Sequence, residues 1–129
     1  MRSLLDDILS ADESIQCVGI IDSDENTLSS RTKDNSLRII SESNEEVYAF
    51  YLKEMKHMQE TFDNCLGTIS QMQFVREKSH HFVYFFRSKI IYVICDVITD
   101  FEKLFKLSNA IKFKIDKTYS SLLYRLPYD

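Results

Sequence analysis

The densest group of possible cation ligands lies in the stretch GIIDSDENTLSS, at residues 19–30. Its side chains have the spacing of the first, third and fifth ligands of a calcium loop: Asp22, Asp24 and Asn26. The sixth position, normally glycine, is Thr27, and the twelfth, normally a bidentate glutamate, is Lys33. A lysine at the closing position repels a cation. The stretch therefore predicts a hairpin turn, because Asp and Asn tolerate positive φ and hydrogen-bond their own backbone.

Histidine and cysteine, the other common metal ligands, form no ligand pattern. His80 and His81 are adjacent, so their side chains would point to opposite faces of a strand. His57 falls on the polar side of a predicted helix. The cysteines are far apart, lack C-x-x-C spacing and lie among apolar neighbours: Cys17, Cys65 and Cys95. We expect no metal site, no cofactor, and buried reduced thiols in a cytoplasmic protein.

Nucleophilic catalysis needs a serine or cysteine on a tight turn beside a base, and the sequence shows no motif of this kind. The chain has two glycines, too few for a G-x-S-x-G elbow or a dinucleotide fingerprint, and it has no phosphate-binding loop. Each cysteine lies in an apolar stretch, where desolvation makes a thiol unreactive. The sequence therefore predicts a protein that is not an enzyme and has no catalytic residue.

The composition favours one folded domain. The chain has 129 residues, of which 44% are hydrophobic and 12% aromatic, enough to bury a single core. Its formal net charge of -4 argues against nucleic acid as a partner, because that affinity depends on Lys and Arg. No run approaches the ~18 apolar residues of a membrane span. We expect a soluble, cytoplasmic protein that does not cross a membrane.

The N-terminal third predicts a helix and two strands. Apolar residues recur at helical spacing from Leu4 to Leu9, with Ser3 as the N-cap. Ile15 to Asp22 is rich in Ile and Val on both faces, as in a central strand, and Thr27 to Thr32 is a more polar second strand. Residues 33–44 are predicted to be a loop that docks through three apolar side chains: Leu37, Ile39 and Ile40.

A long helix is the strongest local signal. Ser43 and Glu46 form a capping box, and Gly67 provides a left-handed stop. One apolar stripe is expected to pack on the sheet: Val47, Tyr51, Met58, Phe62 and Cys65. A second set would lie at the edge, exposed on a monomer, and is the predicted dimer interface: Tyr48, Leu52, Met55, Gln59 and Leu66. The alternative is that the loop at 33–40 or the aromatic C-terminal tail covers this face.

The remaining chain changes to an alternating pattern. Ile69 to Glu77, His81 to Arg87 and Lys89 to Val97 are predicted as three consecutive strands. Thr99 and Glu102 form a second capping box before a helix predicted over residues 100–116. The fold class is therefore α+β, a five-stranded antiparallel sheet with helices on its faces, in the order α-β-β-α-β-β-β-α. We assign residues 1–117 to one domain and 118–129 to an apolar C-terminal extension.

The order of elements resembles the roadblock / dynein-light-chain domain, in the broad group of longin and profilin-like folds. The resemblance is carried by LLDDILSADESIQCVGIIDSDENTLSS, where such domains show a "gavi-D-x-x-G-x-x-l" pattern. From EEVYAFYLKEM through KIIYVICD to FEKLFKLSNAIKFKI, the chain also looks like small archaeal proteins of unassigned function. It departs from the pattern at Asn26, where Gly is usual, and in its C-terminal extension.

The resemblance implies a non-catalytic homodimer in which long helices pack side by side and the sheets join. Such a dimer would be a scaffold that recruits or regulates a protein partner, for which a small GTPase is a candidate. The alternative hypothesis is a sensing domain of the PAS or profilin-like kind, with a small molecule bound in the Tyr- and Phe-lined space between sheet and helix. No residue-level contact with a GTPase is carried over by the resemblance.

Overall fold

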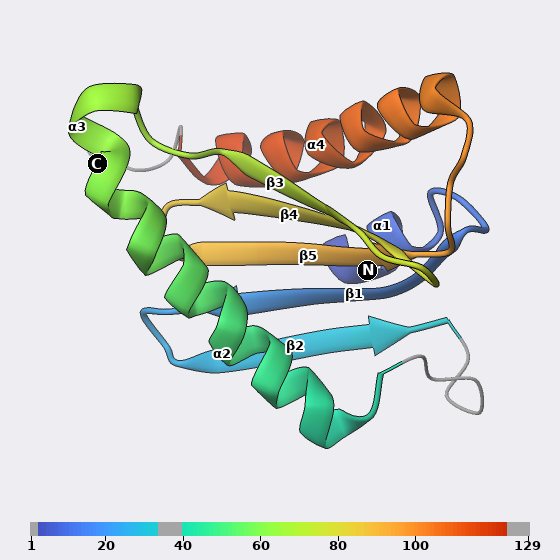
Figure 1. Cartoon of the computed structure of the whole chain (residues 1–129), viewed down its shortest axis with the longest axis horizontal. Coiled ribbons are helices and arrows are strands. Elements are labelled where there is room, and N and C mark those ends of the chain that lie inside the picture. The colour runs from blue at the N-terminus through green and yellow to red at the C-terminus, as the bar shows by residue number, and fades with distance from the viewer. Residues whose placement is uncertain (1–2, 34–39, 124–129) are drawn as a thin grey trace.

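The computed structural model describes residues 3–33 and 40–123 and confirms the predicted fold class (Figure 1). One antiparallel sheet has the strand order β2-β1-β5-β4-β3. The elements are α1 (Leu4–Leu9), β1 (Ile15–Asp22), β2 (Thr27–Thr32), α2 (Glu42–Gln59), η2 (Glu60–Phe62), α3 (Asp63–Leu66), β3 (Gln71–Val75), β4 (His80–Phe86), β5 (Lys89–Cys95) and α4 (Phe101–Leu123).

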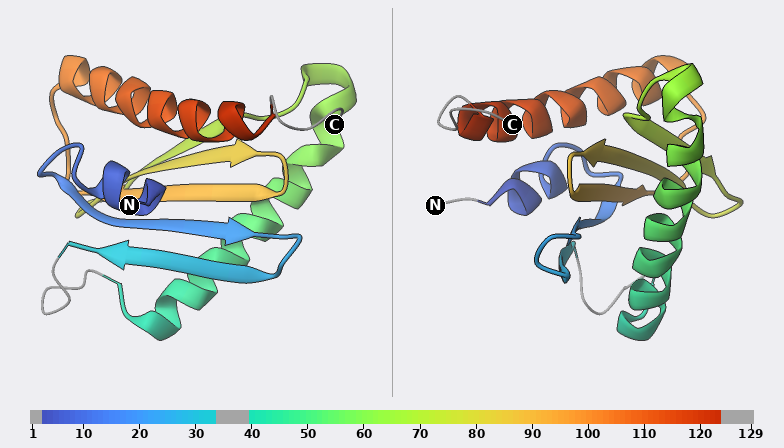
Figure 2. Two further views of the ribbon diagram at one scale, coloured as in Figure 1. Left: turned by 180° about the vertical axis from the view of Figure 1, so that it is seen from behind. Right: turned by 90° about the vertical axis from the view of Figure 1, so that its left-hand side faces the viewer.

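The helices cover both faces of the sheet and make three layers (Figure 2). Helix α2 lies across one face, and α1 and α4 lie on the other. The central strand β5 is buried on both sides because its side chains alternate between two hydrophobic clusters. Ile91 and Val93 pack toward α1 and α4, whereas Ile90 and Ile94 pack toward α2.

The first hairpin confirms the predicted turn in the acidic stretch. Asn26 has a φ of 54°, so it takes the left-handed conformation without glycine. The Asp22 carboxylate accepts the N–H groups of Asp24 and Glu25, and Lys89 Nζ lies 2.7 Å from it. The hydrogen bond from Lys89 lowers the pKa of Asp22. In the part of the chain that the structure describes, no three His, Cys, Asp or Glu side chains gather as a metal site requires.

Both predicted capping boxes are displaced from the helix starts in the structure. Ser41, not Ser43, caps α2, because its Oγ accepts the Asn44 N–H and its backbone is extended. Asp100, not Thr99, caps α4, because its carboxylate accepts the Glu102 N–H. In both helices the cap is therefore a neighbour of the predicted residue, two positions earlier for α2 and one position later for α4.

The ends of two helices also show how far the predicted bounds hold. The helical segment ends at Gly67 as predicted, and this glycine has a positive φ of 83°, but its ψ of 168° is not that of a left-handed helical cap; η2 and α3 replace the last turns of the helix. Helix α4 was predicted to end at residue 116 and instead continues to Leu123. The ring of Tyr119 explains the longer helix, since it is buried and stacks on Phe86 at 5.1 Å.

The cysteines divide into two kinds. Cys17 and Cys95 are buried as predicted, and burial raises the pKa of the Cys95 thiol to about 12. The prediction for Cys65 was wrong, because α3 leaves this residue exposed. The predicted docking residues Leu37 and Ile39 lie outside the described residues, whereas Ile40 is half-buried and packs on the α2-side cluster.

Within residues 3–33 and 40–123, no helix is both long enough and apolar enough to cross a membrane.

Candidate functional site

The side of α2 that faces the sheet is not the one predicted. Leu52 is fully buried and Ala49 is 5% exposed, and both pack in the cluster with Ile90 and Ile94. Three residues of the predicted interface, Tyr48, Met55 and Gln59, are half-buried. The expectation that Leu52 would be exposed was wrong, because α2 is rotated relative to the predicted packing. Only Leu66 of the predicted set is largely exposed, at 79%.

The outer side of α2 carries apolar residues that were expected to pack on the sheet, together with Phe50. Their spacing of three and four residues places them along one stripe, with Glu54 among them. All the apolar members are about half exposed or more: Val47, Phe50, Tyr51 and Met58 on α2, and Phe62 on η2, which continues it. A stripe of large exposed apolar side chains is typical of a protein interface.

Strand β3 is the last strand of the sheet (Figure 1), and its Phe74 ring lies 6.3 Å from the Tyr51 ring of the stripe. Its inner side pairs with β4 from Gln71↔Tyr84 to Val75↔His80, and its outer side is not paired within the described residues. The Val75 side chain is 76% exposed. An open edge offers backbone donors and acceptors to another strand. The α2 stripe and the β3 edge therefore form one surface suited to association.

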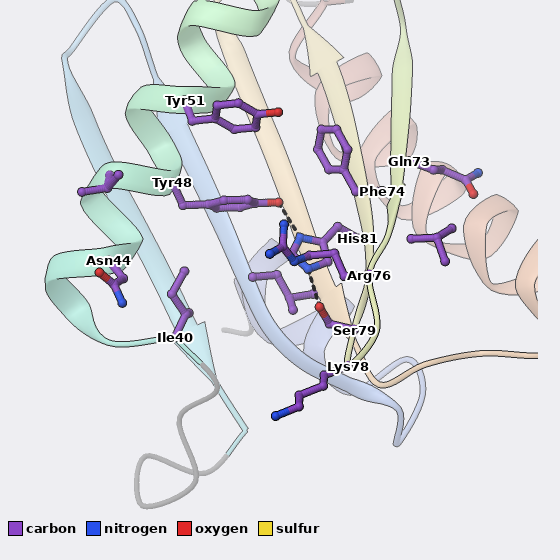
Figure 3. Close-up of a pocket in the computed structure, with 13 residues that line it drawn as sticks. Ile40, Asn44, Tyr48, Tyr51, Gln73, Phe74, Arg76, Lys78, Ser79 and His81 are labelled. Carbon is purple, nitrogen blue, oxygen red and sulfur yellow. Dashed lines mark hydrogen bonds between the residues drawn. The ribbon is translucent and has the colours of Figure 1, made fainter.

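A cavity of about 1030 Å³ opens between the N-terminal half of α2 and strands β3 and β4 (Figure 3). Tyr48 and Tyr51 reach into it from α2, and Phe74 lines it from β3. The Tyr51 and Phe74 rings are 6.3 Å apart between centroids and are tilted. Arg76 and Lys78 lie at the end where β3 turns into β4. The cavity is thus aromatic along its walls and cationic at one end.

A hydrogen-bonded relay crosses the cavity from helix to turn. The Tyr48 hydroxyl lies 2.7 Å from His81 Nδ1, and Ser79 Oγ lies 2.7 Å from His81 Nε2 (Figure 3). Burial, with the positive charge of Arg76 second, lowers the pKa of His81 to about 4. Burial likewise raises the pKa of Tyr48. At neutral pH the relay is therefore uncharged and both side chains are held in fixed orientations.

A buried carboxyl group lies beneath α2, next to this relay. Glu45 is 3% exposed, and the Tyr92 hydroxyl donates a hydrogen bond to its Oε1. The Tyr48 ring packs edge-on against the Tyr92 ring at 5.2 Å. Tyr92 can lie flat here because Gly19, its partner across β1 and β5, has no side chain. These contacts position the N-terminal half of α2 and thereby the cavity.

Comparison with known proteins gives matches in structure alone. No protein-family model and no curated protein matches the sequence. A Roadblock/LC7 domain from Streptomyces avermitilis has a TM-score of 0.67 at 11% identity, over 93% of this chain and 95% of that chain. Myxococcus xanthus MglB has a TM-score of 0.65 at 16% identity, over 92% of this chain and 86% of that chain. The gliding protein MglB from Thermus thermophilus has a TM-score of 0.66 at 9% identity, over 88% of this chain and 84% of that chain.

This chain has a roadblock-like fold. The likeness extends over nearly the whole length of both chains in each comparison, so it includes the sheet, α2 and the helices on the opposite face. It confirms the fold that the sequence resemblance implies. At these identities the likeness concerns the fold and carries no residue-level role.

Within this roadblock-like fold, the sequence indicates α2 correctly as the helix that carries the site, but it does not indicate which side of α2 faces the sheet. Sequence reasoning named Tyr48, which lines the cavity, but did not find Arg76, Ser79 and His81 as its neighbours. The turn between β3 and β4 contains three of the cationic or polar lining residues, and only pairing of β3 with β4 brings that turn opposite α2. Alternation in the strand at 80–86 was the signal that would have placed His81 on the α2 side.

Proposed function

We propose that this chain acts as a non-catalytic homodimeric scaffold that recruits or regulates a protein partner. The observation that supports it is the apolar stripe on the outer side of α2, next to the open edge of β3. In a two-fold dimer this stripe packs against its own copy, which buries side chains such as Phe50 and Met58. The β3 edges of two copies then lie close enough to extend the sheet.

The interface is tested by Phe50→Glu. Phe50 is 63% exposed in the single chain, so the substitution leaves the monomer fold intact. In the dimer, two-fold symmetry places two unpaired carboxylates in an apolar contact, so the dissociation constant is expected to rise about 100-fold or more. Light scattering coupled to gel filtration should give twice the chain mass of 15.2 kDa for the natural protein and the single mass for the variant.

Phe113→Glu is the matched control for this test. Phe113 is 68% exposed and lies on α4, on the opposite face of the sheet from α2. This variant loses the same apolar ring and gains the same charge, and it should remain a dimer. A dimeric Phe50→Glu variant, or a natural protein that is a monomer at micromolar concentration, would contradict the proposed interface.

A small GTPase is the partner class that we propose, on the strength of the family resemblance. A scaffold that distinguishes GTPase states should retain its partner in one nucleotide state only. Immobilised natural protein, incubated with native cell extract plus either a non-hydrolysable GTP analogue or GDP, is expected to retain a GTP-binding protein in one of the two samples. Equal retention in both, or retention only of proteins that bind no nucleotide, argues for a different partner class.

A further inference from the structure

The cavity between α2 and β3 has a composition that the proposed dimerisation does not require. Its volume of about 1030 Å³ is at the upper end of the range that small-molecule sites occupy. Figure 3 draws 13 lining residues, and none of these is acidic. Two are cationic, Arg76 and Lys78, and both come from the same end of the cavity. Such a one-sided distribution of charge selects for an anion.

The positive charge of Arg76 is directed into the cavity. Its side chain extends from the end of β3 toward Tyr48 and His81 (Figure 3). The charge acts on both groups, since it partly opposes the rise that burial causes in the pKa of Tyr48 and adds to the fall that burial causes in the pKa of His81. Among the described residues, Arg76 forms no ion pair with a carboxylate. A planar guanidinium in this position can bind a carboxylate or phosphate through two parallel hydrogen bonds.

The walls next to Arg76 suit a planar apolar group. Tyr48, Tyr51 and Phe74 present three aromatic rings to the cavity, and Phe74 also packs edge-on against His81 at a centroid distance of 6.2 Å. The relay of Tyr48, His81 and Ser79 holds two of these walls in place. A ligand that enters therefore meets a preformed surface and pays little to order it.

We propose that this cavity binds a small organic anion, with its carboxylate or phosphate on Arg76 and its planar apolar body against Tyr51 and Phe74. Lys78 adds positive charge at the mouth, and the Asn44 side chain offers an amide hydrogen-bond donor from α2. The site is one of binding, and no covalent step is involved. Because α2 forms one wall, an occupant contacts the same helix that carries the proposed dimer interface.

The site is separable from the proposed dimer. Val47 and Tyr51 belong to both the stripe and the cavity lining, but Phe50 does not line the cavity. The Phe50→Glu variant should therefore keep the binding site whether or not it dissociates. Binding by that variant separates a failure of this inference from a failure of the proposed scaffold function.

Binding is tested with phenyl phosphate and benzoate as probes, followed by nuclear magnetic resonance of 15N-labelled protein. Both probes should cause saturable shifts of the Arg76 Nε–H and Asn44 side-chain signals, in the natural protein and in Phe50→Glu. Benzyl alcohol, which lacks the charge, and inorganic phosphate, which lacks the ring, should each bind about tenfold more weakly or worse. The ratio of the dissociation constants of the two anionic probes shows whether the site prefers a phosphate or a carboxylate.

Substitutions at Arg76 test whether its guanidinium binds the anionic group of the ligand. Arg76→Gln should weaken phenyl phosphate binding about tenfold or more, and Arg76→Lys should have an intermediate effect because it keeps charge and loses the planar fork. Arg31→Gln, on an exposed arginine of β2, is the matched control and should bind as the natural protein does. The inference is overturned by equal binding in Arg76→Gln, by equal binding of inorganic phosphate, or by unsaturable shifts. It is also overturned if only the monomeric variant binds, since the cavity is then filled by the second copy.

Discussion

Gly19→Ala is expected to lower the free energy of unfolding by about 3 kcal/mol. A Cβ atom on residue 19 would lie 2.1 Å from Cζ of Tyr92, far inside van der Waals contact. The Tyr92 ring cannot move aside, because it is fully buried, donates a hydrogen bond to Glu45 and is covered by Tyr48. Urea denaturation followed by circular dichroism measures this loss.

A double-mutant cycle tests the cause of that loss. In a Tyr92→Leu background the ring is absent, so adding the methyl group at residue 19 should cost less than about 1 kcal/mol. The difference between the two backgrounds is the clash itself. The same cost in both would show that glycine is required at residue 19 for its backbone rather than for the space that Tyr92 occupies.

Leu52→Ala is expected to lower the free energy of unfolding by a similar amount, about 3 kcal/mol. Leu52 is fully buried between α2 and the sheet, where it packs with Ile90 and Ile94. Its truncation removes apolar contacts and leaves a cavity that the rigid sheet cannot fill. The measurement belongs in the Phe50→Glu background, so that any dissociation does not contribute to the unfolding transition.

Met58→Ala in the same background is the control for Leu52→Ala. Met58 is on the same helix but is 67% exposed, so its truncation should change stability by no more than about 0.5 kcal/mol. A large loss from Met58→Ala with only a small loss from Leu52→Ala would mean that α2 packs in the rotation expected from the sequence, with the Met58 side inward.

Periodicity was sufficient to predict the elements and their order. The buried strands β1 and β5 are rich in branched apolar residues, and the glycine stop at Gly67 has a local cause that needs no tertiary context. Caps were less predictable, since Ser41 and Ser43 are both acceptable caps and only the entry angle of the chain selects one.

The orientation of α2 could not be predicted because the helix is apolar on two sides. Leu52 and Met58 lie on different faces, and either face could cover a sheet. The stripe with Met58 contains the larger apolar side chains. An estimate based on buried apolar area alone therefore predicts that this stripe faces the sheet. The structure places that stripe outward, where a second protein chain can cover it.

The cavity and the buried carboxyl were beyond sequence reasoning for a different reason. Glu45 lies in the first turn of a helix, where an acidic residue normally has a helix-dipole role and stays in water. Its burial becomes visible only when the hydroxyl of Tyr92 is placed opposite, and that requires the register of β1 against β5. Arg76 and Tyr51 line the same cavity only because segments distant in sequence pack together.

The hydrogen bond between Tyr92 and Glu45 gives α2 a preferred rotation about its own axis. The burial of apolar side chains differs little between two rotations of α2 about its axis. Turning the helix by half a turn would place Phe50 and Met58 against the sheet instead of Leu52. That turn would also carry Glu45 into solvent and leave the Tyr92 hydroxyl buried without this acceptor, a penalty of about 1–3 kcal/mol. This contact, together with the hydrogen bond from Tyr48 to His81, thus favours the rotation that keeps Leu52 in the protein's own core and presents Phe50 and Met58 to other molecules.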